Sequence, residues 1–426
     1  MLAFLVYRSR AVRAFSFSVI ALSFSLKAFS PYKTALSLSV KALGLLLVLL
    51  TLAGCANTNR VTTTVVTPLE QPGAIANESQ LLDLAVLPFD PGLENFKDDD
   101  TTVSPTVRSA EAQYLPNQLA ETIQKTAAWG AVRQVPSRNT VVDVYVAGKI
   151  VESTGETLTL KIDVSDASNR HWYSKTYTET VGSYAYDQQN RTQQDPFQGL
   201  FNRIANDLLE YRQQLSPQQV TNLRAVSNLR FAKDFSPEAF SSHITEAPDG
   251  QLQITRLPAA NDPILQRIQR IRERDYLFID TMQEHYDTFS RQMDTPYQEW
   301  RAASYDEMVA VQELKRQSRT RTIGGIAAVI GGIIASGSNS GSGRAAGAVA
   351  IGTGAMMVKS GLSKRGELKI HEDALTEMAQ SLEAEVAPQV IQLEDRTITL
   401  TGNVEAQYQQ WKTLLREIYQ AERGGI

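Results

Sequence analysis

The sequence predicts an α+β protein, with a small mixed α/β domain over residues 81–190 and a helical module over residues 195–322 that leads into a glycine-rich helical hairpin. Three observations support this prediction. Runs of β-branched residues and of alternating apolar and polar residues, which are typical of strands, occupy the first region. From residue 195 the apolar residues recur every three or four positions, as on a helix. Residues 323–361 are then rich in glycine and alanine.

Ahead of the folded part, residues 1–54 have the order of a secretory signal peptide. A positive Lys41 is followed by an apolar run from Ala42 to Leu52 and then by small residues. The run is too short to cross a hydrocarbon layer of roughly 30 Å as a permanent helix. Because residues 1–39 make the signal long, a true start at Val40 is the alternative to a signal that spans all of this segment.

The signal ends at the only cysteine of the chain, Cys55. The quartet Leu52, Ala53, Gly54 and Cys55 resembles the lipobox of bacterial lipoproteins. The resemblance implies cleavage between Gly54 and Cys55, palmitate and related acyl chains on Cys55, and a membrane partner reached through this lipid anchor. Ala56 in place of aspartate at the second mature position implies the outer membrane, with the protein on its periplasmic face. A buried structural cysteine is the alternative.

Residues 55–80 predict a lipidated, flexible tether, because they are polar, rich in threonine and interrupted by proline and glycine. Without residues 1–54, which hold six basic and no acidic residues, the chain has 36 basic and 46 acidic residues and a net charge of −10. A nucleic-acid partner requires clustered positive charge, so we expect no nucleic acid.

The α/β domain is predicted to hold one helix and five strands. The successive runs are a strand, a helix, two strands and a folded pair of strands, over residues 81–90, 107–129, 131–136, 141–153 and 156–181. Hairpin turns are expected at Ser153–Glu156 and at Ser165–Asn169. Pro116 is expected to break or restart the helix.

Three segments of this domain, "LAVLPFD", "VYVAGKIVES" and "LTLKIDVSDASNRHWYSKTY", resemble one domain found in several envelope proteins. These are the curli-secretion lipoprotein, the lipoprotein activators of penicillin-binding proteins and the Tol-system periplasmic protein. The resemblance, over about residues 81–185, implies a non-catalytic scaffold or accessory factor in outer-membrane or cell-wall assembly that binds an envelope protein partner. The chain lacks the paired amphipathic hairpins of a secretion channel.

The helical module carries repeated helix-start signals. Each places a capping residue before a proline suited to the first turn, at Asp195-Pro196, Ser216-Pro217, Ser236-Pro237, Asp262-Pro263 and Thr295-Pro296. Stripes of apolar and aromatic residues follow these signals, and we expect them to pack between helices. After the glycine-rich hairpin, residues 362–426 predict a helix, a strand and a closing helix.

The glycine-rich segment at residues 323–361 has small residues spaced for close approach of helices. They are Gly324, Ala328, Gly332 and Ser336 on the first arm and Gly343, Gly347 and Gly352 on the second. The pattern resembles glycine-zipper segments of bacterial envelope proteins. It implies membrane or oligomer contact, hence a homo-oligomer, and the alternative function of a membrane-remodelling or pore-forming protein. A buried helix pair and a disordered loop are the other interpretations.

Chemical motifs are scarce. The four histidines, His171, His243, His285 and His371, show no metal-binding spacing, and neither a nucleophile elbow nor a phosphate-binding loop occurs. The acidic run Asp98–Asp100 favours a solvated loop over a calcium site. We therefore expect no enzyme, no metal and no cofactor. A hydrolase of envelope polymer, built from carboxylates distant in sequence, is a second alternative function.

Overall fold

In the computed structural model, the described residues are 66–73, 77–94, 104–186, 194–259, 261–336, 389–392 and 397–424, together with residues 373, 376, 377 and 380. Within these ranges, the side chains at 307 and from 310 to 336 are not described. The fold class is α+β with a mixed sheet, as predicted.

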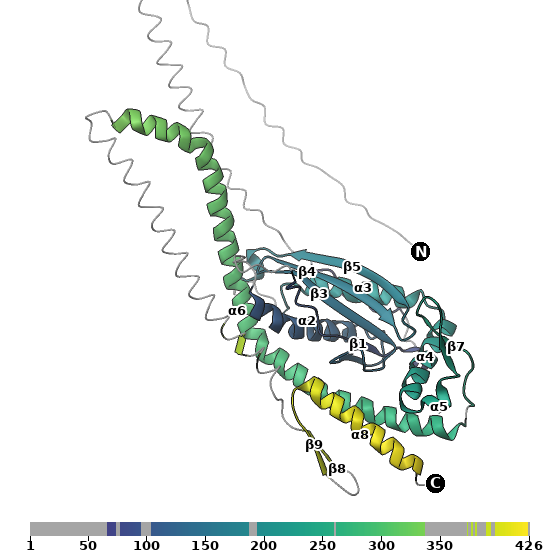
Figure 1. The fold of residues 1–426 in the computed structure, drawn as a ribbon. Helices are drawn as coiled ribbons and strands as arrows, with labels where there is room; N and C mark the ends of the chain where they lie inside the picture. Colours follow the sequence, from purple (N-terminus) through teal and green to yellow (C-terminus); the bar gives the residue numbers. More distant parts are fainter. Residues whose placement is uncertain are drawn as a thin grey trace, which may run out of the picture. The chain divides into compact units, whose positions relative to one another are not determined.

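A five-stranded sheet in the order β2-β1-β3-β4-β5 forms the centre of the α/β region (Figure 1). β1 pairs in parallel with β2 and with β3, whereas β3, β4 and β5 are antiparallel neighbours. From β1 to β5, the strands are Leu84–Val86, Val132–Gln134, Val144–Ser153, Thr157–Asp166 and His171–Thr180. All five strands and both hairpin turns agree with the prediction.

Helices α2 (Pro105–Lys125) and α3 (Gln198–Gln213) pack together on one face of the sheet. Alternation along β4 explains why this face is covered, because Leu158, Leu160 and the next alternate residues are fully buried. Lys161 lies on the opposite face and is exposed. The sheet therefore has one apolar face and one polar face, as its sequence pattern predicts.

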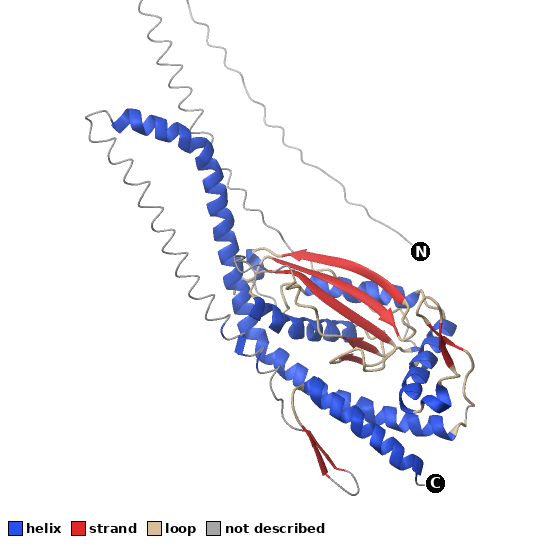
Figure 2. Ribbon diagram, in the orientation of Figure 1, coloured by secondary structure: helices blue, strands red, loops and turns tan. Residues whose placement is uncertain are grey.

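The remaining described elements are short turns, further helices and two small hairpins (Figure 2). Short 3-10 turns η1 and η2 span Glu78–Gln80 and Ser183–Ala185. The helices are α4 (Pro217–Phe235), α5 (Pro237–Phe240), α6 (Pro263–Ser336) and α8 (Val404–Gly424). Two small hairpins are made by β6 (Ile244–Glu246) with β7 (Leu252–Ile254) and by β8 (Gln389–Gln392) with β9 (Thr397–Leu400). The strand β9 and the closing helix α8 match the predicted C-terminal elements.

The predicted α/β domain and helical module share one hydrophobic core. Their junction is made by α3, which contacts α2 and β5, and by α6, which contacts α2 and β2 and also packs on α4 and α8. Gln283 of α6 closes the edge of β2, since its side-chain amide accepts a hydrogen bond from Gln134 N (2.9 Å) and donates one to Gln134 O (2.6 Å). The apolar stripes of the helices and the apolar face of the sheet therefore bury one another.

Local helix signals gave mixed results. Ser216 forms a capping box with Gln219, and Asp262 accepts hydrogen bonds from the first backbone N–H groups of α6, both as predicted. Pro116 does not break α2, and Pro296 lies inside α6 instead of starting a helix. Both predictions of a helix boundary were wrong, because buried side chains beside these prolines hold the helices in register despite the lost backbone donor.

Part of the predicted tether is bound to α3. The side-chain amide of Asn202 donates to Thr67 O (2.7 Å), while Asn206 donates to Pro68 O (2.9 Å) and accepts from Glu70 N (2.9 Å). Residues 66–73 thus pack on the helix that covers the sheet. The residues from Cys55 to Val65 lie outside the described part of the chain.

Candidate functional site

The residues that the sequence singled out for function are not brought together in the described structure. Gly54 and Cys55, and the second-arm residues Gly343, Gly347 and Gly352, lie outside the described residues. The first-arm residues Gly324, Ala328, Gly332 and Ser336 lie on the last turns of α6, so the predicted helical state of that arm is confirmed. α6 also passes without interruption through the predicted boundary between residues 322 and 323.

A buried ion pair holds α6 at Arg301, shortly before the part of the helix whose side chains are not described. Arg301 is 0% exposed, and its Nη1 lies 2.8 Å from Asp195 Oδ2, in the loop before α3. The guanidinium also lies over the rings of Phe197 and Tyr297, at 4.7 and 4.1 Å from their centroids. Burial acts to lower the pKa of Arg301, but Asp195 and the surrounding tyrosines outweigh it, so this pKa is raised and the arginine stays charged.

A second buried carboxylate joins α2 to the same part of α6. Glu111 Oε1 accepts hydrogen bonds from Ser153 Oγ and from Tyr297 Oη, both at 2.5 Å. Burial raises the pKa of Tyr297 well above its usual value, so the phenol remains a donor. Together with Asp195 and Arg301, these residues form what we call the α6 clamp, which fixes α6 to the sheet, to α2 and to the loop before α3.

A cluster of polar side chains lies where β1 and β3 begin, next to α4 and α6. Asp143 accepts from Asp83 N (2.9 Å), and Arg272 donates to Ser227 Oγ (2.7 Å) and to Tyr276 Oη (2.6 Å). Burial raises the pKa of Asp143, and it raises the pKa of Tyr276 to about 12. These polar groups are hydrogen-bonded within the protein beside a cavity of about 210 Å³, which favours a structural role.

Asp275 faces α8 from the neighbouring turn of α6. Its carboxylate is buried, and Tyr408 Oη donates to it from 3.4 Å. Burial raises the pKa of Asp275 to about 6, although the charge of Lys412 acts in the opposite direction. The rings of Phe278 on α6 and Trp411 on α8 stack on each other, with their centroids 4.7 Å apart. The contact between α6 and α8 therefore includes both an aromatic stack and a buried carboxylate whose charge is costly to bury at neutral pH.

We expect Asp275→Asn to stabilise the protein at pH 7.5. A carboxyl whose pKa is raised on folding adds stability below its unfolded pKa, near 4, and that stability is lost as the pH rises through about 6. The neutral amide avoids this loss, so the gain in unfolding free energy has an upper limit of about 3 kcal/mol at pH 7.5. Urea unfolding at pH 4.5 and pH 7.5 checks the prediction. If the unfolding free energies of the variant and the wild type differed by the same amount at both pH values, the prediction would be contradicted.

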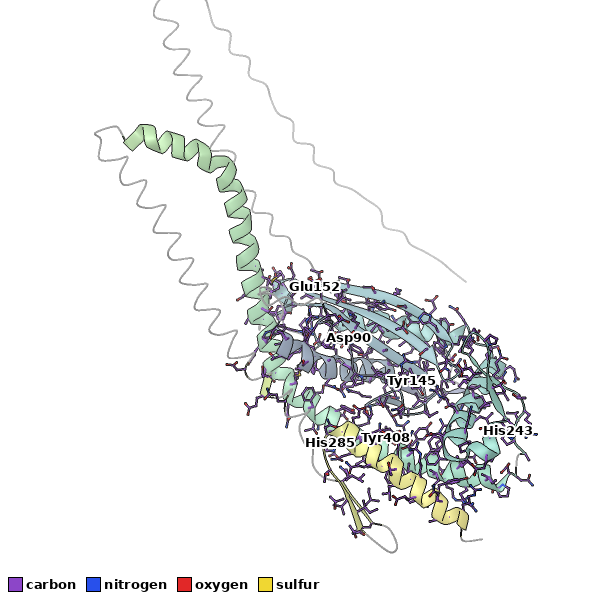
Figure 3. All side chains as sticks on the ribbon, viewed as in Figure 1. Asp90, Tyr145, Glu152, His243, His285 and Tyr408 are labelled. Atoms are coloured by element: carbon purple, nitrogen blue, oxygen red, sulfur yellow. The ribbon has the colours of Figure 1, made fainter. Side chains whose placement is uncertain are left out.

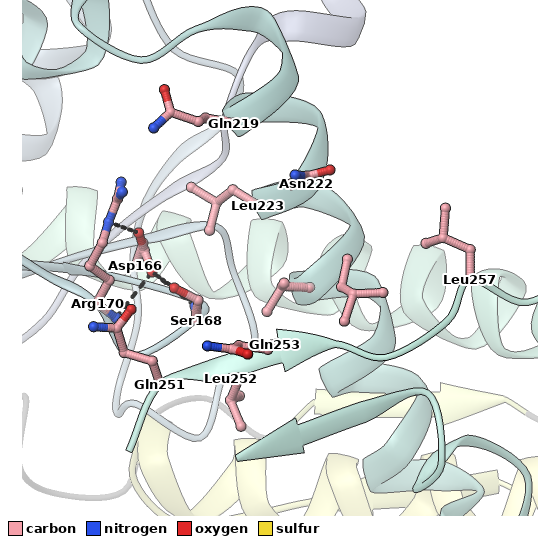
Figure 4. Close-up of a pocket in the computed structure, with 12 residues that line it drawn as sticks. Asp166, Ser168, Arg170, Gln219, Asn222, Leu223, Gln251, Leu252, Gln253 and Leu257 are labelled. Atoms are coloured by element: carbon pink, nitrogen blue, oxygen red, sulfur yellow. Dashed lines mark hydrogen bonds and ion pairs between the residues drawn. The ribbon is translucent and has the colours of Figure 1, made fainter. Parts of the chain in front are cut away.

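A groove of about 460 Å³ lies between α4, β7 and the turn that joins β4 to β5 (Figure 4). We call it the α4–β7 groove. Its apolar wall includes Leu223, Leu252 and Ile254, and amide side chains such as Asn222 and Gln251 border it. It is larger than the cavity beside Arg272 and than a third cavity, of about 310 Å³, near the start of α8. Its volume is sufficient for a small ligand.

The charged residues that line the groove, Asp166 and Arg170, pair with each other, with Nε and Oδ2 3.2 Å apart. Asp166 Oδ1 also accepts from Ser168 N (2.9 Å) and Ser168 Oγ (2.5 Å), and Oδ2 accepts from Trp172 Nε1 (2.8 Å). The carboxylate therefore fixes the turn between β4 and β5. It is not placed as a free base or metal ligand.

The histidines are separate and play local roles. His243 Nδ1 lies 2.9 Å from Arg256 O, His285 Nε2 lies 3.3 Å from Gln389 Nε2, and His171 Nε2 lies 3.2 Å from Asp163. Figure 3 shows His243 and His285 on different parts of the fold, and His371 lies outside the described residues. Within the described residues, no group of three or more histidine, cysteine or acidic side chains could hold a metal ion.

The α4–β7 groove was not predicted from the sequence, because the β6–β7 hairpin was not predicted. The available signal was Asp249-Gly250, a dipeptide typical of tight hairpin turns, between two short runs with alternating apolar residues. Gly250 has a φ of +80°, which glycine adopts readily. In the structure, the β6–β7 hairpin lies beside the turn between β4 and β5, and Asn169 Nδ2 donates to Gly250 O (3.2 Å). These two residues are more than 80 positions apart, so even a predicted hairpin could not have indicated that contact.

The described residues form an α+β fold with a surface groove whose two charged lining residues pair with each other, and with a long helix held by the α6 clamp. Comparison with protein-family models, with curated proteins and with solved structures gave no match. The resemblances to lipoproteins, to envelope domains and to glycine zippers therefore stay predictions. Of the helices in the described part of the chain, none is long and apolar enough to cross a membrane.

Proposed function

We propose that this chain is a lipid-anchored envelope protein without catalytic activity, which serves as a scaffold or accessory factor in outer-membrane or cell-wall assembly. The observation that supports this proposal is the course of α6. The helix is fixed in the body by the α6 clamp, and its last described ring contact joins Tyr305 to Tyr186, at 5.5 Å between centroids. It then continues for about 30 residues, roughly 45 Å at 1.5 Å per residue.

A helix anchored at one end and extended at the other suits a protein that positions partners. The predicted lipid anchor would hold the chain at the periplasmic face of the outer membrane, while α6 presents a segment of small residues at a distance from its clamp. Neither role requires a reacting group. The buried carboxylates at Glu111 and Asp195 are engaged in the α6 clamp, which accounts for their burial without chemistry.

The alternative function, a membrane-remodelling or pore-forming oligomer, is favoured by one further observation. Gly324, Ala328, Gly332 and Ser336 occupy one continuous helix, and a four-residue spacing keeps them near one face of it. Such a face suits a second copy of the same helix. The hydrolase alternative has no specific observation in its favour among the described residues.

Lipid attachment is tested by labelling the full chain with radioactive palmitate in a Gram-negative host. We expect the label and membrane fractionation in the wild type, and loss of the label with Cys55→Ser. A labelled Cys55→Ser protein, or an unlabelled wild type, would contradict the anchor. Loss of only part of the membrane-bound pool in Cys55→Ser, with complete loss of label, would indicate that the glycine-rich segment also binds membrane.

A single engineered thiol separates the scaffold from the oligomer. Because acylation would occupy the thiol of Cys55, Gly332→Cys would carry the only free thiol of the mature chain. Ile334→Cys is the matched control, about 200° around the same helix. Oxidised homodimers at 332 and not at 334 would favour the oligomer. A photo-crosslinker attached to either cysteine would test the scaffold, which is favoured by links to other envelope proteins. If neither homodimers nor such links form, both the oligomer and the scaffold are contradicted.

A further inference from the structure

We infer that the α4–β7 groove binds an extended, uncharged peptide segment of a partner protein, which adds as a third strand to the outer edge of β7. This inference rests on the proposed function, because it names the chemistry of the partner that a scaffold would hold. It depends on the register of one hairpin, on the charges of the groove walls and on a turn that is already rigid.

The register of β6 and β7 leaves backbone groups of β7 facing the groove. Thr255 N donates to His243 O (2.9 Å) and Ala247 N donates to Gln251 O (2.8 Å), so odd-numbered residues form the hydrogen-bonded pairs of this antiparallel ladder. The backbone N–H and C=O groups of Leu252 and Ile254 consequently point away from β6. Figure 4 shows the lining residues of the groove on that side of β7.

One of these outward groups already makes a strand-like bond. Leu252 N donates to Ser168 O (2.8 Å), in the turn between β4 and β5. Among the described residues, none is bonded to Leu252 O, Ile254 N or Ile254 O. The edge of β7 is therefore capped at one end and open along the groove, which is the arrangement that strand addition uses.

The walls of the groove specify a neutral ligand. Asp166 and Arg170 cancel each other in a close ion pair, and the other polar lining side chains are amides and a serine hydroxyl. A charged ligand would find no complementary charge there. Backbone amides of a peptide, in contrast, match both the open edge of β7 and the amide side chains.

The apolar wall also specifies the pattern of the peptide. Leu252 and Ile254 pack toward the core, whereas Gln253 is exposed. In an added strand, the residues beside Leu252 and Ile254 would face Leu223 of α4, and the intervening residues would face solvent. The ligand is therefore a segment of about five residues with apolar side chains at alternate positions.

The turn that ends the groove is rigid before a ligand binds. Its backbone is held by Asp166 and by Arg230 Nη1, which donates to Ala167 O (3.0 Å). A site formed in advance loses less conformational entropy on binding.

The test uses the purified full chain in detergent micelles and hydrogen–deuterium exchange measured by mass spectrometry. The probes are three acetylated peptide amides with threonine at odd and valine, leucine or isoleucine at even positions, five residues long and at about 1 mM. We expect slower exchange at residues 252–256 with at least one of them. N-methylation of the two even positions removes the donors that would face β7 in antiparallel addition and should abolish protection, whereas N-methylation of the central threonine should preserve it.

Protein variants give an independent control. Ile254→Pro removes one outward N–H without removing a bond to β6, and Ile254→Val is its matched control; exchange in β6 shows whether the hairpin stays folded. Leu257→Asp changes a groove residue that is 65% exposed, so it tests the apolar wall without a core substitution. We expect it to weaken peptide binding by about tenfold or more.

The inference is wrong if none of the three peptides protects β7, or if N-methylation at the even positions has no effect. Protection of β7 that grows with protein concentration in the absence of peptide would assign the groove to a second copy of the chain and would also contradict it. If the protein is labelled with palmitate but binds none of the peptides, the inference about the groove is contradicted and the lipid anchor is not. Peptide binding by a chain that proves unlabelled would contradict only the proposed function.

Discussion

Gly155→Ala is expected to destabilise the protein by about 3 kcal/mol, the upper end of the usual range for overpacking. A Cβ atom at this position would lie 2.2 Å from Arg301 O and 2.3 Å from Tyr305 N, both in the backbone of α6. Backbone atoms of a helix cannot move aside as the end of a flexible side chain can, so either the turn between β3 and β4 or α6 itself must shift.

Two hydrogen bonds would be lost or stretched by such a shift. Gly155 N donates to Ser304 Oγ (3.3 Å), and Tyr186 Oη donates to Gly155 O (2.6 Å). Both lie next to the α6 clamp, so the substitution also tests whether α6 is fixed to the sheet at this point. Urea unfolding gives the change in free energy, and faster amide exchange at residues 299–306 would localise the damage to α6.

Gly73→Ala is the matched control for this prediction. No heavy atom lies within 4 Å of a Cβ built at Gly73, so the same chemical change should alter the unfolding free energy by less than about 0.5 kcal/mol. If Gly155→Ala cost no more than the control, the close approach of the turn to α6 would not exist in solution.

Gly155 also shows how far local sequence patterns reach. The turn at Ser153–Glu156 was predicted, because alternating strands on both sides and a glycine between them are a local signal. The reason that only glycine fits is the backbone of α6, almost 150 residues later in the sequence. A pattern of neighbouring residues contains no information about that contact.

The same limit explains the other differences. The five strands were predicted because their periodicity is local, whereas Pro116 and Pro296 were misread because burial on α2 and α6 outweighs the local preference of proline. In the sequence, Arg301 is one of many basic residues in the segment that forms α6, and nothing near it distinguishes it from the others. Its complete burial depends on the loop before α3, so no spacing within α6 could have predicted the α6 clamp.

The α4–β7 groove was beyond prediction for a related reason. Its walls come from the turn before β5, from the first half of α4 and from β7, which are separated in sequence. The sequence could supply one wall, through the Asp249-Gly250 turn signal. The juxtaposition that makes a binding site is a property of the folded chain.

Asp195→Ala should have the largest effect on stability, about 3–5 kcal/mol. The substitution leaves the Arg301 guanidinium fully buried without its carboxylate partner, and its Nε and Nη2 atoms already have no hydrogen-bond partner among the described residues. It also removes the acceptor of Phe197 N (2.8 Å) and of Gln298 Nε2 (2.8 Å), so the loop before α3 loses its attachment to α6.

A double-mutant cycle separates the buried charge from these hydrogen bonds. Arg301→Met in the Asp195→Ala background removes the unpaired charge while it keeps the length of the side chain, and we expect it to recover a large part of the lost stability. The surface control is Glu238→Ala, whose ion pair with Arg423 is exposed on both sides and should contribute little to stability. If Asp195→Ala cost no more than Glu238→Ala, Arg301 would have to reach solvent or another partner, and the α6 clamp could not be what fixes α6 to the body.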